Sequence, residues 1–145
     1  MKPLKYSKIL LMISLIIIGL NACGKDDGNP TEVNATFVGN WKLTKLSSVI
    51  SGTPIEMTPE LAGTQMSISA LADGSFSMTT TDAAGTRTST GTWGTANNKL
   101  TLKFSDGTSA TYDYSFSGNV MTIKGYPYSH PTFGNITLTL DFTKQ

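Results

Sequence analysis

The chain has very little of the side-chain chemistry on which enzymes and metal sites depend. Its 145 residues include one cysteine, one histidine and one arginine. A zinc site draws three or four ligands from cysteine, histidine and carboxylate groups, and the sequence clusters no such set. Gly-x-Ser-x-Gly, phosphate-loop and dinucleotide-binding motifs are missing too. We therefore expect no catalytic residues, no metal, no cofactor and no enzymatic activity.

Charge is also scarce, at 14% of the chain. Three lysines (Lys2, Lys5 and Lys8) precede an apolar run, and removing them changes the formal net charge from +1 to −2. The rest of the sequence has no basic cluster with interleaved aromatic residues. This balance argues against a nucleic-acid partner.

The N-terminal segment has the pattern of an export signal. After the three lysines, residues 9–20 are apolar, and this run is shorter than the ~20 residues that a membrane-spanning helix needs. The run ends in Leu20-Asn21-Ala22-Cys23, which resembles the lipobox of bacterial lipoproteins. That resemblance implies removal of residues 1–22 and acylation of Cys23 by palmitate-type chains.

The alternative for Cys23 is a free thiol beside an ordinary cleavage site. Since no second cysteine exists, an exported chain could not pair it within the molecule, whereas acylation removes the reactive thiol. Two or three acyl chains on one cysteine give stable attachment to a membrane. We expect a bacterial outer-membrane lipoprotein in which residues 23–36, rich in Gly, Asn, Pro and charge, form a flexible tether.

The first residues of the expected mature chain bear on which side of the membrane it faces. Lys25-Asp26-Asp27 resembles the surface-export tags of some Gram-negative lipoproteins. The plainer interpretation of this stretch is a solvated tether. We place exposure at the cell surface slightly ahead of exposure to the periplasm.

Residues 37–145 have the alternation of an antiparallel β-protein. Apolar residues recur at every second position, with Thr, Ser, Lys and Asp between them, and no segment has a long helical period. The pattern predicts about eight strands, at 40–50, 65–71, 75–82, 87–96, 99–104, 108–117, 120–125 and 135–143.

The turns between these strands predict their register. Two-residue turns at Gly118-Asn119 and Asn97-Asn98 would pair Phe116 with Met121 and Trp93 with Leu102. A loop around Ala84-Gly85 would pair Phe76 with Trp93, and a bulged turn at Asp73-Gly74 would pair Ala70 with Phe76. Sequential hairpins with one wet face predict an up-and-down barrel, because closure removes the exposed edges.

The sequence is similar to the bacterial lipocalin-like lipoproteins. The similarity rests on Gly39-x-Trp41 at the first strand and on an ordered set of later motifs: Asp73-Gly74-Ser75-Phe76, Gly91-Thr92-Trp93, Asn98-Lys99-Leu100-Thr101-Leu102 and Thr-Leu-Thr-Leu-Asp-Phe at 137–142. It implies that Gly39 and Trp41 lie at the closed end of a barrel. In the wider family an arginine of the last strand often covers that tryptophan, but Arg87, the one arginine here, comes earlier in the chain.

Strand parity then predicts where ligands would enter. If Trp41 lies at the closed end, both long connections, 51–65 and 125–134, fall at the open end. Thr58 before Pro59-Glu60 predicts a single helical turn, which could act as a lid. Long loops often carry function. The candidate ligand-binding residues are Tyr112, Tyr114, Tyr126, Tyr128, His130 and Phe133.

Each of these candidates has a structural alternative. The inward aromatic residues, including Tyr112 and Tyr114, could simply fill a barrel that is barely wide enough for its own side chains. His130, between prolines, could be an ordinary solvated loop residue.

Three functions fit these observations. The first is a lipid-anchored carrier or sensor that binds a small apolar or amphipathic molecule at the open rim. The second is a protein-interaction module, such as an envelope inhibitor or assembly partner, that uses the two long loops around a solid core. The third is a scaffold without a ligand.

Overall fold

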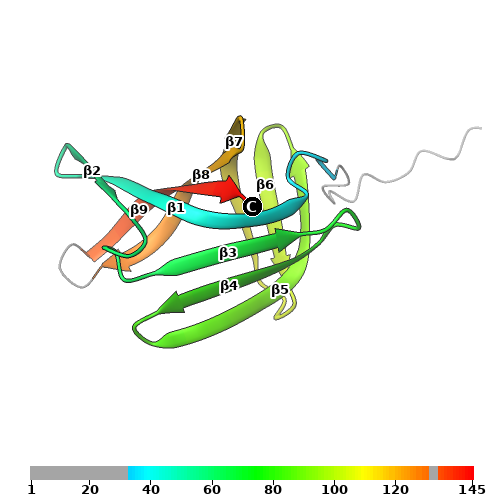
Figure 1. Cartoon of the computed structure of the whole chain (residues 1–145), viewed down its shortest axis with the longest axis horizontal. Helices are drawn as coiled ribbons and strands as arrows, with labels where there is room; N and C mark the ends of the chain where they lie inside the picture. The colour runs from blue at the N-terminus through cyan, green and yellow to red at the C-terminus, as the bar shows by residue number, and fades with distance from the viewer. Residues whose placement is uncertain (1–32, 131–133) are drawn as a thin grey trace, which may run out of the picture.

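The computed structural model describes residues 33–130 and 134–145 (Figure 1). Within them the chain forms nine antiparallel strands and no helix. The strands are β1 (Gly39–Ile50), β2 (Thr53–Met57), β3 (Gln65–Ala70), β4 (Ser75–Asp82), β5 (Gly85–Ala96), β6 (Lys99–Phe104), β7 (Ser109–Ser117), β8 (Val120–His130) and β9 (Gly134–Lys144).

The strands form one sheet that closes on itself. Their order is β2-β1-β3-β4-β5-β6-β7-β8-β9, and β1 also pairs with β9, so eight strands make a closed barrel while β2 lies outside the ring. The expected all-β, antiparallel up-and-down barrel of about eight strands is confirmed. Sixteen apolar side chains of the described segments are buried, and they come from the inward faces of the barrel strands and from Phe37.

β1 is shared among three partners along its length. Its first part, residues 39–42, pairs with β3, whereas residues 46–50 pair with β2. On its other edge, residues 41–47 pair with β9, across a β-bulge between Leu43 and Lys45. Because β2 takes the place of β3 from Leu46 onward, β3 and β1 separate toward one end, and residues 58–64 connect β2 to β3 there.

Two of the expected connections are wrong in their details. The connection 51–65 contains β2, which pairs with β1 through a two-residue turn at Ser51-Gly52, where both φ angles are positive (51° and 82°). The connection 125–134 is mostly strand. A β-bulge at Gly125 (φ 86°) shifts the register by one residue, so the alternation that ends at Ile123 resumes at Tyr126.

The β1–β2 and β4–β5 connections lie at one end of the barrel, on the left of Figure 1, as parity predicts. β8 ends and β9 begins at the same end. The β3–β4 turn and the entering N-terminal segment lie at the other end. The pairings of Phe116 with Met121, Trp93 with Leu102 and Ala70 with Phe76 are confirmed.

The predicted pairing of Phe76 with Trp93 is wrong by two residues. Phe76 lies opposite Gly91, because Ala83 and Ala84 form the turn and Asp82 pairs with Gly85. The Asp82 Oδ1 accepts a hydrogen bond from the Ala84 N–H at 2.9 Å, which fixes this turn. A shift of two leaves every side chain on its predicted face, since the period of a strand is two.

The closed end is sealed by an aromatic cluster beneath residues 33–38. The indole N–H of Trp41 donates to the Phe37 carbonyl at 2.7 Å, and the Phe37 ring lies 4.5 Å from that of Trp93. The Lys144 ammonium, from the last strand, lies 5.3 Å from the centre of the Trp41 ring. A lysine thus covers this tryptophan where the last strand has no arginine. Gly39 leaves room for it, because a Cβ there would lie 2.7 Å from the Lys144 Cε.

Gly91 lets two strands approach closely. A Cβ at this position would lie 2.0 Å from the Lys103 carbonyl oxygen. Gly91 pairs with Phe76 on one side and with Phe104 on the other. Since Gly91 has no side chain, the two phenylalanine rings meet over it, edge to face, with their centres 5.5 Å apart.

We predict that Gly91→Ala lowers the free energy of unfolding by at least ~2 kcal/mol, because the added methyl forces β5 away from β6. Urea unfolding of the mature domain measures the change. The exposed Ser115→Ala on β7 is the control and should lie within about 0.5 kcal/mol of the wild type. A Gly91→Ala variant as stable as this control would show that the β5–β6 approach is wrong.

Candidate functional site

A small apolar pocket lies at the open end, between β1, β2, β8, β9 and the segment that follows β2. Its cavity volume is about 160 Å³. The residues around it are mostly aliphatic: Leu46, Ser48, Ile50, Ile55, Met57, Leu61, Ala62, Thr64, Tyr128, Ile136 and Leu138. We call this the rim pocket. It exists because β3 leaves β1 at this end and does not fill the space beside Leu46.

Residues 58–64 cover the rim pocket as a hydrogen-bonded turn. The Ala62 N–H donates to the Thr58 carbonyl at 3.0 Å, and the Thr64 N–H donates to the Pro59 carbonyl at 3.0 Å. The Thr58 hydroxyl accepts from the Leu61 N–H at 3.4 Å, as an N-cap does. Leu61 contributes to the pocket wall while 80% of its surface remains exposed. The cover over the pocket is therefore thin.

A second, smaller cavity of about 80 Å³ lies deeper in the barrel. Tyr112 and Tyr126 line it, and their rings stack with centres 6.0 Å apart. The Leu138 opposite Tyr126 on β9 belongs to the rim pocket, so the two cavities are neighbours along β8 and β9. The barrel interior is thus not fully packed at this end.

Both of these phenols are hard to ionise in place. Burial raises the pKa of Tyr112, and the neighbouring Tyr126 raises it further. Burial also raises the pKa of Tyr126, while the positive charge of Arg87 opposes that shift. At neutral pH both hydroxyls are therefore protonated and able to donate hydrogen bonds.

The structure brings some of the predicted site residues together and separates others. Tyr128 lines the rim pocket, and Tyr112 and Tyr126 line the cavity beneath it. Tyr114 lines neither of these two cavities, and its hydroxyl accepts a hydrogen bond from the Asn34 side chain at 3.3 Å. His130 is the last residue of β8, and Phe133 lies outside the described residues.

The sequence did not lead us to predict that β2 forms part of the wall of the rim pocket. Ile55 and Met57 face the rim pocket from a strand that we interpreted as loop. The signal that could have revealed it is the Ser51-Gly52 pair flanked by alternating residues, which is typical of a two-residue hairpin turn. Pro54 argued against a strand here, because proline cannot donate a hydrogen bond within a sheet. β2 lies at the edge of the sheet, however, where proline is tolerated.

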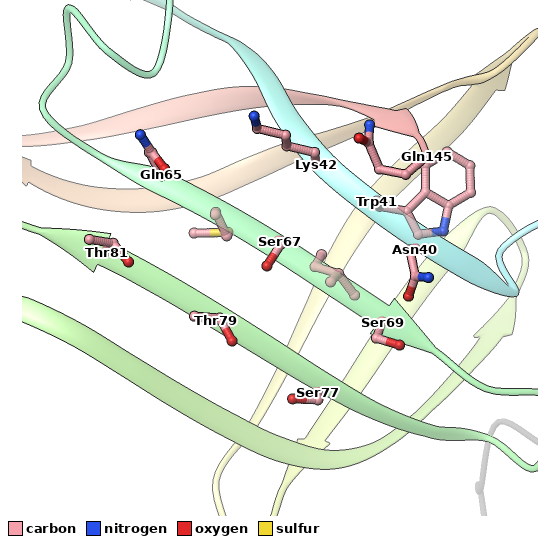
Figure 2. Close-up of a pocket in the computed structure, with 12 residues that line it drawn as sticks. Asn40, Trp41, Lys42, Gln65, Ser67, Ser69, Ser77, Thr79, Thr81 and Gln145 are labelled. Carbon is pink, nitrogen blue, oxygen red and sulfur yellow. The ribbon is translucent and has the colours of Figure 1, made fainter.

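A wider polar hollow of about 480 Å³ lies on the outer face of β1, β3 and β4 (Figure 2). Short hydroxyl side chains lie along β3 and β4. They are Ser67 and Ser69 on β3, and Ser77, Thr79 and Thr81 on β4. It is shallow, and such hydroxyls cover the outer face of other strands too, for example where Thr101 meets Thr111. The rim pocket, partly enclosed and mostly apolar, is the better candidate for a ligand.

Within residues 33–130 and 134–145, no group of three or more His, Cys, Asp or Glu side chains could hold a metal ion. No helix in these same segments is long and apolar enough to cross a membrane.

Comparison with known proteins identifies the family. The family model of the lipocalin-like domain matches residues 37–123, and the chain belongs to this family. A crystal structure of an uncharacterized protein from Bacteroides eggerthii is similar at 11% identity and a TM-score of 0.46, covering 74% of this chain and 98% of the other. No curated protein matches the sequence. A lipocalin-like barrel suggests ligand binding in general.

We predict that Tyr112 and Tyr126 ionise above the ordinary phenol pKa of about 10. Since the folded state holds these protons more tightly than the unfolded state, the free energy of unfolding should fall as the pH rises above about 10. Phenolate absorbance, compared between the wild type and Tyr112→Phe or Tyr126→Phe, isolates each group. Titration of either group like a free tyrosine would contradict the buried placement.

Proposed function

We propose that this protein is an envelope lipoprotein, anchored through Cys23, whose barrel binds a small apolar or amphipathic molecule at its open rim and catalyses no reaction. The rim pocket carries the proposal. It is mostly apolar, it is partly enclosed by residues 58–64, and a second cavity lined by two tyrosines lies next to it along β8 and β9. A mostly apolar hollow with a few polar groups is the usual form of a small-molecule site.

The pocket limits the size of the ligand. Its volume of about 160 Å³ is about half of the ~300 Å³ at which drug-sized sites begin. A ligand must therefore be small, or it must insert only one slender apolar part. The exposed cover at Leu61 leaves the rest of such a molecule free to extend into solvent.

The position of the tether supports the orientation that we propose. Residue 33 lies at the closed end, where a Cβ on Gly74 would meet the Val33 side chain at 3.7 Å. Cys23 precedes Val33 by only ten residues in the sequence. An anchor at Cys23 would thus hold the closed end nearer the membrane and turn the rim pocket away from it, toward ligands arriving from outside.

We predict that Cys23→Ser abolishes membrane attachment. Without the thiol no acyl chain is added, and two or more chains are what make an anchor stable. Metabolic labelling with an alkyne analogue of palmitate should label the wild type and not the variant, and the variant should appear in the soluble fraction. Equal labelling of both proteins would exclude Cys23 as the anchor.

We predict that Ala62→Phe, which fills the rim pocket, weakens the binding of a neutral, environment-sensitive apolar dye by at least tenfold, or about 1.4 kcal/mol. The thermal midpoint should stay level or rise, because the new ring fills a void. Ala84→Phe, in the β4–β5 turn outside the pocket, is the matched control and should bind the dye normally. Equal binding by Ala62→Phe would place the ligand elsewhere.

The exposed apolar residues at the same rim favour a second candidate, a protein-interaction module. Val49 is 68% exposed and Leu61 80% exposed, and both lie at the open end. The Ala62→Phe variant separates the two functions. It closes the pocket but keeps the outward surface of Val49 and Leu61, so a protein partner would still bind while a small ligand would not.

A further inference from the structure

The exposed apolar side chains of this barrel lie at its two ends. Within the described segments, the large hydrophobic residues that are well exposed are Val49, Leu61 and Tyr128 at the open end, and Val33 and Leu71 at the closed end. The outward positions of the strands between the two ends are mostly Thr, Ser and Lys. The first group surrounds the rim pocket, whereas the second lies at the end where the N-terminal segment enters.

Val33 and Leu71 form one patch. Leu71 begins the β3–β4 turn, in which the Gly74 N–H donates to the Leu71 carbonyl at 3.1 Å. Val33 lies against the same turn, because a Cβ on Gly74 would lie 3.7 Å from the Val33 side chain. The N-terminal segment and this turn are both on the right of Figure 1. Leu71 is 52% exposed and Val33 is 40% exposed, and we call the two residues the closed-end patch.

Hydrogen bonds to the barrel hold both halves of the patch in place. The Trp93 N–H donates to the Gly74 carbonyl at 2.7 Å, and the Trp93 indole N–H donates to the carbonyl of the following residue at 3.0 Å. The residue after Val33 is Asn34, whose side chain donates to the Tyr114 hydroxyl at 3.3 Å. The barrel therefore presents the two side chains from fixed backbone positions.

The β3–β4 turn does not itself require an apolar residue at position 71. Leu71 contributes its backbone N–H and carbonyl to the turn, and the Asp73 carboxylate accepts from the Ser75 N–H at 2.8 Å. Turns favour Gly, Asn, Asp and Ser, and the β5–β6 and β7–β8 turns at this end are Asn97-Asn98 and Gly118-Asn119. An exposed leucine in this turn thus indicates a contact outside the barrel.

The length of the tether indicates what that contact is. Cys23 precedes Val33 by ten residues, which span at most about 35 Å when fully extended. β1 has 12 residues, so a barrel with strands tilted by about 40° is roughly 30 Å tall. The open end would reach a bilayer only if the tether were almost fully stretched, whereas the closed end reaches it at any shorter extension. An acylated Cys23 would therefore bring the closed-end patch to the membrane surface.

The patch has little charge to keep it away from lipid. Residues 33–38 and 71–74 contain one charged side chain, Asp73. Its Oδ1 accepts hydrogen bonds from both the N–H and the hydroxyl of Ser75, at 2.8 and 2.6 Å. This composition suits a zwitterionic lipid surface, because an anionic surface would repel Asp73.

We propose that the closed-end patch rests on the lipid bilayer, with Leu71 and Val33 inserted where the headgroups meet the acyl chains, so that the barrel stands upright on the membrane. The inference rests on the proposed function, since it needs the anchor at Cys23, and it adds a second contact that fixes the orientation of the barrel. A weak interaction is enough, because the anchor already holds the patch close to the bilayer. A tenfold preference for the upright orientation corresponds to about 1.4 kcal/mol.

The test uses the full acylated protein in phosphatidylcholine vesicles. A thiol-reactive dye is attached beside the patch through Ala72→Cys or, for comparison, in the exposed β4–β5 turn at the open end through Ala84→Cys. We expect a nitroxide near the lipid headgroup to quench the dye at position 72 at least about threefold more than at position 84, because interfacial side chains lie ~5–10 Å into the bilayer surface. Val33→Gln combined with Leu71→Gln should remove this difference. Val49→Gln, at the open end, is the matched control and should keep it.

The outcomes separate this inference from the proposed function. If the wild type takes up the dye at Cys23 or does not bind the vesicles, the anchor fails, and the inference fails with it. If the protein is bound and the dye is quenched equally at both positions, or more at position 84, the anchor stands and the upright orientation is overturned. Undiminished quenching at position 72 in the doubly substituted variant, with the fold verified by circular dichroism, also overturns it.

Discussion

The pairing of β1 with three strands is the constraint on which the rest of the structure depends. Near the Gly39 end, β1 is held between β3 and β9, and the barrel is closed over the Trp41 cluster. Beyond Leu46 the partner changes to β2, and β3 turns away. One strand therefore produces both a sealed end and an end with a pocket, and the change of partner along β1 decides where a ligand can enter.

The sequence predicted what depends on local pattern. Alternation and turn residues were sufficient for the inward faces, for the Phe116–Met121 register and for the end at which the long connections lie. The errors occurred where one residue changes the geometry. Gly125 interrupts the alternation with a bulge, and Asp82 selects a turn one residue earlier than the predicted one, which shifts the β4–β5 register by two residues. Neither effect appears in hydrophobic periodicity, because both depend on backbone conformation.

The candidate site was harder to predict because it is formed by residues far apart in the sequence. Aromatic residues in a long connection suggested a rim site, yet most of the pocket wall is aliphatic and part of it comes from β2. Tyr114 shows the limit of such reasoning, since it has the inward parity of Tyr112 but bonds to Asn34 in the segment before β1.

The central claim is that the open end of this barrel holds a small molecule. Native mass spectrometry of the protein, extracted from the envelope of its own organism in mild detergent, tests it most directly. The account predicts a mass increment from one small apolar or amphipathic molecule or a short homologous series, lost on denaturation and absent from Ala62→Phe prepared in the same way. A bare lipidated chain in every preparation, together with a filled rim in an experimental structure, would contradict the claim.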